Sequence, residues 1–243
     1  MALKGAKTTR WQRLGAVVLV LMVLSGAGSV GHVYSTYWTR VHRLPVLVTR
    51  LVRHHGGRMV SLADVSPWFM RALIATEDRT FYTNLGVSVR GILRALWADA
   101  ETGRVIQGGS TLTQELVRDR MLTPRRTVRR KLTEALLSIL VTMLYSKREI
   151  LTLYVNQVYL GAGAYGVWAA SRRYFGETPR ELTLAQAALL AGLPQAPSAY
   201  DPLRHLGAAR RRQWEVLTGM VNDGMISAQR ARSAYGEPLG LNS

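Results

Sequence analysis

The first hydrophobic feature of the chain is a long uncharged run near its N-terminus. No Lys, Arg, Asp or Glu occurs between residues 14 and 39, and the core of the run, LGAVVLVLMVLSGAGSVGHV, is 20 residues long. A helix needs about 20 apolar residues to cross a bilayer. Trp11 precedes the run, and Tyr34, Tyr37 and Trp38 follow it, as is typical of membrane interfaces. The pattern predicts a transmembrane anchor over residues 14–38.

A cleaved signal peptide is the alternative interpretation of this run. Its apolar stretch would be residues 14–24, with the small residues Ser25 and Ala27 at the cleavage site. Charge alone leaves the orientation open, because basic residues flank the run on both sides: Lys4, Lys7, Arg10 and Arg13 before it, and Arg40, Arg43, Arg50 and Arg53 after it. The apolar segment 44–51 is expected to lie on the outer leaflet or to pack on the domain.

Beyond residue 66 the apolar positions recur at helical spacing. Ser66 followed by Pro67 is typical of a helix start. The apolar stripe of this first helix is formed by Phe69, Met70, Leu73 and Ile74. Strand-like alternation is scarce, so the pattern predicts a mainly α domain.

Further helices are predicted over residues 89–101 and 124–144. Ser146 with Glu149, and Thr183 with Gln186, have the spacing of capping boxes at the start of two more helices.

Composition narrows the classes of protein. A chain of 243 residues accommodates one domain of about 180 residues and an anchor. The absence of cysteine excludes disulfides, thiolate metal sites and a cysteine nucleophile. A formal charge of +17 indicates an anionic partner, which could be nucleic acid, an anionic membrane or a phosphorylated substrate. The alternative interpretation of this excess of basic residues is that most of them are solvated arginines on the surface.

The first candidate for chemistry is the stretch 75–81, ATEDRTF. Glu77 and Asp78 follow an apolar helix, where burial can raise the pKa of a carboxyl group toward the range of a general base. A solvated helix end is the alternative.

The second candidate is the stretch 107–114, QGGSTLTQ. Its glycines followed by Ser110 and Thr111 predict a loop that leads into a helix N-terminus, where free N–H groups and hydroxyls can hold an anion or a sugar. An ordinary capped turn is the alternative, since the lysine and the spacing of a P-loop are missing.

The third candidate is a cluster of basic residues, Arg118, Arg126, Arg130 and Lys131. Arg126, Arg130 and Glu134 lie at i, i+4 and i+8 and therefore share one helix face. Guanidinium groups bind phosphate bidentately, so the cluster predicts a phosphate site, in which Glu134 orients a cation or coordinates a metal. A surface ion-pair stripe and a DNA-binding helix are the alternatives.

Together these stretches resemble the family 51 glycosyltransferases, which polymerise lipid II into peptidoglycan outside the cytoplasmic membrane. The matching motifs follow one another at the family's spacing over about residues 62–222: Glu77-Asp78-x-x-Phe81, Gly86, Arg94-Ala95, 108–114, Arg130-Lys131-x-x-Glu134, Lys147-x-x-Ile150-Leu151-x-x-Tyr154-x-Asn156, 158–166, 174–176 and 188–197.

The resemblance implies a lysozyme-like helical fold with a small membrane-proximal jaw, preceded by one transmembrane helix. It implies that Glu77 is the general base toward the 4-hydroxyl of the acceptor sugar, and that Glu134 is the second essential carboxylate, near the donor phosphates. Transfer would be inverting, with undecaprenyl diphosphate leaving. The implied substrate-binding residues are Asp78, Arg94, Ser110, Thr111, Gln114, Arg118, Arg126, Arg130, Lys131 and Asn156.

Departures from the family pattern occur at Asn84, Glu115 and Thr152, where the family usually has His, Gln and Glu. None of these residues is a proposed base or phosphate ligand. No cofactor is expected to be required, although a magnesium ion at the donor diphosphate, near Glu134, is an option that we keep open.

The chain contains no Ser-x-x-Lys motif, so a monofunctional enzyme without a transpeptidase domain is expected. The expected organisation is a cytoplasmic basic tail (1–13), the anchor (14–38), a membrane-proximal linker (39–61), the glycosyltransferase domain (62–236) and a tail (237–243). The resemblance places the N-terminus inside the cytoplasmic (inner) membrane and the catalytic domain outside it.

The expected partners are lipid II, the lipid-linked glycan, the membrane and other proteins of wall synthesis, but not nucleic acid. The rival functions are a lysozyme-like glycoside hydrolase and a catalytically weak scaffold that binds lipid II. A nucleic-acid binder is favoured only by the net charge.

Overall fold

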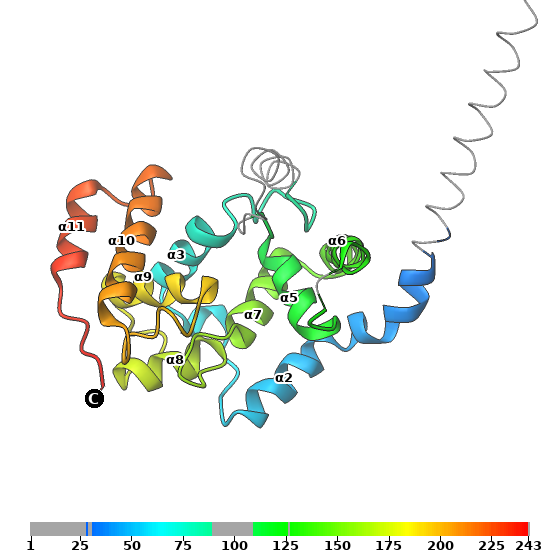
Figure 1. Ribbon diagram of the computed structural model, residues 1–243, viewed down its shortest axis with the longest axis horizontal. Helices are drawn as coiled ribbons and strands as arrows, with labels where there is room; N and C mark the ends of the chain where they lie inside the picture. The colour runs from blue at the N-terminus through cyan, green and yellow to red at the C-terminus, as the bar shows by residue number, and fades with distance from the viewer. Residues whose placement is uncertain (1–27, 29–30, 89–108, 126, 243) are drawn as a thin grey trace, which may run out of the picture.

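The computed structural model describes residue 28 and residues 31–88, 109–125 and 127–242 (Figure 1). Its helices are α2 (Leu44–His54), η1 (Leu62–Asp64), α3 (Pro67–Glu77), α5 (Leu112–Met121), α6 (Val128–Leu144), α7 (Lys147–Gln157), α8 (Gly166–Phe175), α9 (Leu184–Gly192), η2 (Leu193–Gln195), α10 (Leu206–Asn222) and α11 (Ala228–Gly236). Within these ranges the extended segments pair only at an isolated bridge between Tyr159 and Tyr165. The prediction of a mainly α fold is therefore confirmed.

Helix α9 forms the centre of one half of the domain. Its sequence, LAQAALLAG, is buried along its whole length, as expected for a helix that is apolar on all sides. It packs against α3 and α10, and α11 lies on the outer side of α10 (Figure 1). The end of α3, which carries Glu77, is therefore held by well-packed neighbours.

The other half of the domain is built from α2, α5, α6 and α7 (Figure 1). Helix α5 packs against both α6 and α7. Helix α2 covers α7 with its buried side chains Leu44, Val48 and Val52. Of the two placements expected for the apolar segment 44–51, the structure thus has the second, packed on the domain.

Local capping explains where several helices begin. Both predicted capping boxes, Ser146 with Glu149 and Thr183 with Gln186, are present. Helix α6 begins at Val128 and not at residue 124 as predicted, because Thr127 is extended and its side chain accepts a hydrogen bond from the N–H of Arg130.

The start of α3 also differs in detail from the prediction. Ser66 occupies the N-cap position, but its hydroxyl makes no capping bond and donates instead to the carbonyl of Leu182, at 2.8 Å. Of the expected stripe, Phe69, Leu73 and Ile74 are buried, whereas Met70 is only partly buried.

None of the helices in the described ranges is both long and apolar enough to cross a membrane. Most of the predicted anchor, and the helix predicted over residues 89–101, lie outside those ranges.

Candidate active site

Glu77 is the last residue of α3, and its carboxyl group is largely enclosed by protein. Its Oε1 atom is buried and has no hydrogen-bond partner among the described residues. Burial, followed by the negative charge of Glu115, raises the pKa of Glu77 to about 8, against the opposing positive charges of Arg212 and Arg118. A carboxyl group with a free oxygen and a high proton affinity has the properties of a general base that works near neutral pH.

Asp78 follows directly, but its carboxylate is hydrogen-bonded to neighbouring parts of the domain. Its carboxylate accepts hydrogen bonds from the Nδ2 of Asn84 at 2.9 and 3.0 Å, from the hydroxyl of Thr80 at 3.1 Å and from the N–H of Leu112 at 3.3 Å. Burial raises the pKa of Asp78 although these donors oppose the change. These contacts tie the end of α3 to the start of α5, and they favour a positioning role for Asp78 over direct contact with substrate.

Asn84, where the family usually has His, is the hub of the loop after α3. Besides Asp78, it contacts Lys147 of α7, whose Nζ donates to the Asn84 Oδ1 atom at 3.0 Å. The same oxygen accepts from the N–H of Gly86 at 2.9 Å. The amide thus provides both a donor and acceptors within one side chain. This explains how Asn84 can order the loop in place of a His.

Gly86 fixes this loop against α6. Its φ of +90° is in the region that favours glycine, and a Cβ there would come within 2.3 Å of the carbonyl oxygen of Ser138. The carbonyl of Gly86 in turn accepts from the hydroxyl of Thr111, at 2.7 Å. The loop after Glu77 is therefore joined to the N-terminus of α5 and to the side of α6.

The start of α5 brings three of the predicted binding residues together. Thr111 and Gln114 form a capping box, so their side chains satisfy the first turn of the helix. Ser110 precedes them, and its hydroxyl accepts a hydrogen bond from the Nζ of Lys131 at 2.8 Å. This contact links the Gly-Gly-Ser-Thr stretch to the basic helix α6, as the prediction of a shared site requires.

Glu134 lies on α6 with no exposed surface, between two cations. Its Oε1 pairs with the Nζ of Lys131, and its Oε2 lies 3.4 Å from the Nη1 of Arg130. The guanidinium of Arg130 has a buried Nε without a partner in the described part of the chain. A buried carboxylate needs such pairing, and of the two cations Lys131 also contacts Ser110.

Arg118 lies on the last turn of α5 and has acidic partners of its own. Its Nε is 3.0 Å from the Oδ1 of Asp119, and its Nη2 is 3.7 Å from the Oε1 of Glu115. Glu115 also accepts a hydrogen bond from the hydroxyl of Tyr154, at 2.8 Å. The charges of Glu115, Glu134 and Arg118 act on one another. The charge of Glu115, one of the departures from the family pattern, therefore acts on Glu77 and interacts with that of Glu134.

The hydrogen bonds of Asn156 go to backbone groups and not to other residues of the predicted site. Its amide exchanges two hydrogen bonds of 2.8 Å with the backbone of Val60 and donates a third to the carbonyl of Thr152. It is buried, so its contacts favour a structural role. The hydroxyl of Thr152, the third departure, donates to the carbonyl of Arg148 within α7. The remaining predicted residues, Arg94 and Arg126, lie outside the described residues.

Arg212 of α10 is a further charged group at this site that the motifs did not point to. Its charge acts on Glu77, although the two residues are far apart in sequence. Only the packing of α10 against α3 brings them together.

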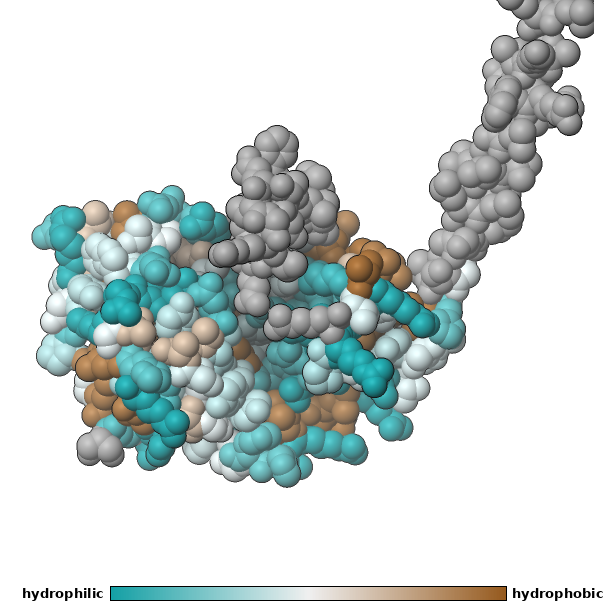
Figure 2. All heavy atoms as spheres, viewed as in Figure 1, coloured by the Kyte–Doolittle hydropathy of each residue, from teal (hydrophilic) through white to brown (hydrophobic). Residues whose placement is uncertain are grey.

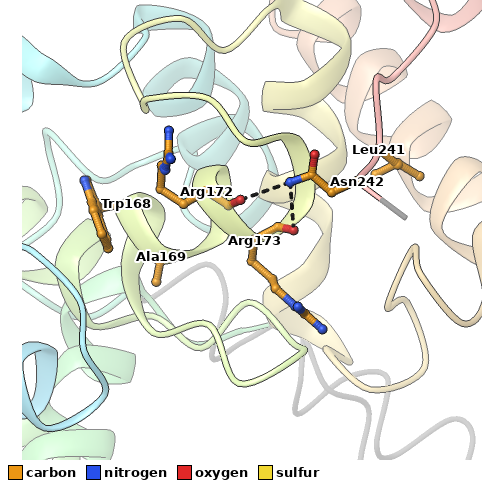
Figure 3. A pocket seen from close by; sticks show the side chains of 6 residues that line it. All are labelled: Trp168, Ala169, Arg172, Arg173, Leu241 and Asn242. Carbon is orange, nitrogen blue, oxygen red and sulfur yellow. Dashed lines mark hydrogen bonds between the residues drawn. The ribbon is translucent and has the colours of Figure 1, made fainter.

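An open cavity of about 780 Å³ lies beside α8 (Figure 3). It is lined by Trp168, Ala169, Arg172, Arg173, Leu241 and Asn242. The amide of Asn242 donates to the carbonyls of Arg172 and Arg173, at 3.2 and 3.5 Å, and so holds the C-terminal segment on α8 (Figure 3). None of the residues predicted for catalysis or binding lines this cavity, so it is separate from the candidate site.

A mainly helical domain that holds a partly buried Glu77 and a buried Glu134 paired with two cations defines the class of an enzyme that works with carboxylates. Comparison with known proteins agrees with this class. The family model described as transglycosylase matches residues 46–221. The chain belongs to this family, the family 51 glycosyltransferases, which confirms the resemblance.

Penicillin-binding proteins are among the similar proteins. Penicillin-binding protein 1A of Aquifex aeolicus is 43% identical over 180 residues, which cover 74% of this chain and 25% of the relative. Penicillin-binding protein 1A of Escherichia coli is 37% identical over 246 residues, which cover 93% of this chain and 29% of the relative. The chain thus spans about a quarter of the length of these relatives.

Among solved structures, a crystal structure of penicillin-binding protein 1A from Haemophilus influenzae matches 76% of this chain and 18% of its own, with 27% identity and a TM-score of 0.46.

Proposed function

We propose that this chain polymerises lipid II into glycan strands, with Glu77 as the base and Glu134 as the organiser of a diphosphate site. The observation that carries the proposal is the different surroundings of the two carboxylates. Glu77 has a buried oxygen without a partner among the described residues, whereas both oxygens of Glu134 are paired with cations. The first is suited to accept a proton, and the second is suited to hold positive charge in place.

In the proposed reaction, the proton of the acceptor 4-hydroxyl moves to Glu77 while that oxygen attacks the anomeric carbon of the donor. The bond from this carbon to the diphosphate oxygen breaks with inversion, and the electron pair leaves with undecaprenyl diphosphate. Negative charge therefore develops on the diphosphate, where Arg118, Arg130 and Lys131 stabilise it. Arg94 and Arg126 are assigned to the donor site by the family motif alone.

The proposed chemistry requires the ionised form of Glu77. Since burial raises its pKa to about 8, the free enzyme at neutral pH holds mostly the protonated form. We expect kcat/KM to rise with pH through a midpoint near pH 8, where half of Glu77 is ionised, and to level off at higher pH.

A magnesium ion held by the protein is not supported by the contacts of Glu134. Both of its oxygens already pair with cations, and no group of three or more His, Cys, Asp or Glu side chains in the described ranges could hold a metal. We therefore derive no catalytic step through a metal. That no cofactor is required stays a prediction, with a magnesium ion at the donor diphosphate as the open alternative.

We also propose that the domain works at the outer face of the cytoplasmic membrane, anchored by residues 14–38. An exposed apolar face supports this placement. On α6 it comprises Val128, Leu132, Met143 and Leu144, and on the adjoining loop Tyr82 and Leu85. Figure 2 shows hydrophobic residues gathered over the α6 region. Exposed apolar surface of this kind marks contact with a membrane or a partner, and it is where we place the jaw. Partners in wall synthesis and monofunctional action stay predictions.

The test is incubation of the purified full chain with labelled lipid II, in parallel with Glu77→Gln and Glu134→Gln. Long glycan strands from the wild type, lost in both variants, would support the proposal. Shortening of preformed glycan would show a hydrolase instead, and binding of lipid II without turnover would show a scaffold. Salt-sensitive binding to DNA that lipid II does not compete away would favour a nucleic-acid binder.

A further inference from the structure

A second cavity, of about 440 Å³, lies between α10 and α11. It is lined by Arg211, Trp214 and Glu215 of α10 and by Arg232 and Tyr235 of α11. The two helices pack side by side at one end of the domain (Figure 1). The lining includes none of the described residues that were predicted for catalysis or substrate binding. Its volume lies within the range of small-molecule sites, about 300–1,000 Å³.

Two aromatic rings on the lining of this cavity are held in place by the core. The rings of Trp214 and Tyr235 meet edge to face, with their centroids 5.2 Å apart. The guanidinium of Arg210 lies over the Tyr235 ring, 4.4 Å from its centroid, and also donates to the carbonyl of Tyr235. Arg210 donates in turn to the buried Gln213, at 3.0 Å, whose amide donates to the carbonyl of Ala185 in α9, at 2.7 Å. The rings are thus positioned without a ligand, while Trp214 stays 39% exposed.

Arg211 and Arg232 bring two positive charges to the same cavity. Both are exposed, and neither has an ion-pair or hydrogen-bond partner in the part of the chain that the structure describes. The acid on the lining, Glu215, is already paired, since its Oε2 lies 2.7 Å from the Nη1 of Arg212. The cavity therefore carries an excess of positive charge, and guanidinium groups bind carboxylates through two parallel hydrogen bonds.

The lining fits a ligand that combines ring faces with carboxylates. The C–H faces of a sugar ring are apolar and pack on aromatic side chains, whose own rings are largely apolar. Peptidoglycan offers both features, because its sugars carry peptides with free carboxylates. The chain belongs to a family whose members polymerise this glycan, so the polymer is produced beside the cavity.

We propose that the cavity between α10 and α11 is a second glycan site, which binds peptidoglycan outside the candidate active site. Trp214 and Tyr235 stack on a sugar ring, and Arg211 and Arg232 bind carboxylates of the attached peptide. The choice of ligand rests on the proposed function, because it assumes that the chain acts on peptidoglycan. A strand bound here stays with the domain while the active site takes up its next substrate.

The test is isothermal titration calorimetry of the full chain in detergent micelles. The probe is a soluble disaccharide of peptidoglycan that carries its peptide with free carboxylates. Trp214→Ala, and the double variant Arg211→Gln with Arg232→Gln, are each expected to raise the Kd at least about tenfold. Because both arginines are exposed, the double variant leaves the core intact and keeps the test decisive if Trp214→Ala does not fold.

The cavity beside α8 supplies matched controls, because it is lined by the same types of residue. Trp168→Ala and Arg173→Gln are expected to keep the wild-type Kd, and so is Lys131→Met, which alters the candidate active site. Amidation of the peptide carboxylates on the probe should weaken binding to the wild type but not to the double arginine variant, since the two changes remove the same interaction.

Four results would overturn the proposal. The first is an unchanged Kd in both Trp214→Ala and the double arginine variant, and the second is an equal loss of binding in the controls. The third is equally tight binding of the peptide without its sugars, which would assign the cavity to an acidic peptide. The fourth is a dimer of the chain that Trp214→Ala disrupts, which would assign the cavity to a second copy.

The binding measurement is independent of turnover and therefore separates this inference from the proposed function. Binding that is lost in the cavity variants of a chain that does not polymerise lipid II would preserve the second site while refuting the reaction. Polymerisation by a wild-type chain that does not bind the probe would do the reverse.

Discussion

Glu77→Gln replaces the enclosed carboxyl group at the end of α3 by a neutral group of nearly the same shape. In the folded chain, burial and then Glu115 raise the pKa of Glu77 from 4.5 to about 8. A carboxyl group whose pKa is raised on folding leaves stability intact below pH 4.5 and lowers it as the pH rises from 4.5 to about 8. Glu77→Gln does not lose stability in this way, so the difference in the free energy of unfolding between the variant and the wild type should grow with pH.

The expected size follows from the pKa change. Each unit corresponds to about 1.4 kcal/mol, so wild type should be less stable than Glu77→Gln by about 3 kcal/mol at pH 7 and about 5 kcal/mol above pH 8. For a chain of this length, 5 kcal/mol corresponds to a Tm difference on the order of 10 °C. The same substitution is expected to abolish polymerisation, so greater stability would accompany loss of activity.

The assay is thermal unfolding of the full chain in detergent micelles, followed by circular dichroism between pH 4.5 and 9. Glu237→Gln serves as the control for removal of a carboxyl group elsewhere, and its Tm should run parallel to that of the wild type. If the curve of Glu77→Gln also ran parallel to the wild-type curve, the proton affinity assigned to Glu77 would be refuted.

Three further substitutions test the framework around the site. Gly86→Ala is expected to destabilise the fold by about 2–5 kcal/mol, because a side chain is strained at this positive φ and meets the α6 backbone; denaturant unfolding measures it. Asn84→Ala should cost about 1–3 kcal/mol by leaving the Asp78 carboxylate short of donors, and an unchanged unfolding midpoint would contradict the hub role. Lys131→Met should lower kcat for lipid II by at least about tenfold and weaken binding of a diphosphate inhibitor, because Glu134 loses a paired cation; a normal kcat would remove Lys131 from the site.

Local signals along the sequence were sufficient for much of the fold. The capping boxes that begin α7 and α9, and the apolar stripe of α3, depend on residues within a turn or two of one another, so they can be predicted without tertiary structure. The start of α6, predicted at residue 124, was wrong by four residues because Thr127 caps the helix, and only the backbone conformation decides between nearby starts.

The sequence motifs contain the candidate residues but do not distinguish those that act on substrate from those that hold the fold. Asp78 stands in the motif of Glu77 and Asn156 in a later one, yet the side chains of both make hydrogen bonds to backbone far away in sequence, at Leu112 and Val60. Such contacts depend on how the helices pack against one another, and no sequence pattern near either residue predicts them.

The sequence by itself determined the family, the mainly α class and the positions of Glu77, Glu134 and the basic cluster, because these reside in short motifs with fixed spacing. Only the tertiary structure decided which charges act on Glu77. The charges of Glu115 on α5 and Arg212 on α10 act on Glu77, because the proton affinity of a carboxyl group depends on burial and on charges close in space rather than close in sequence.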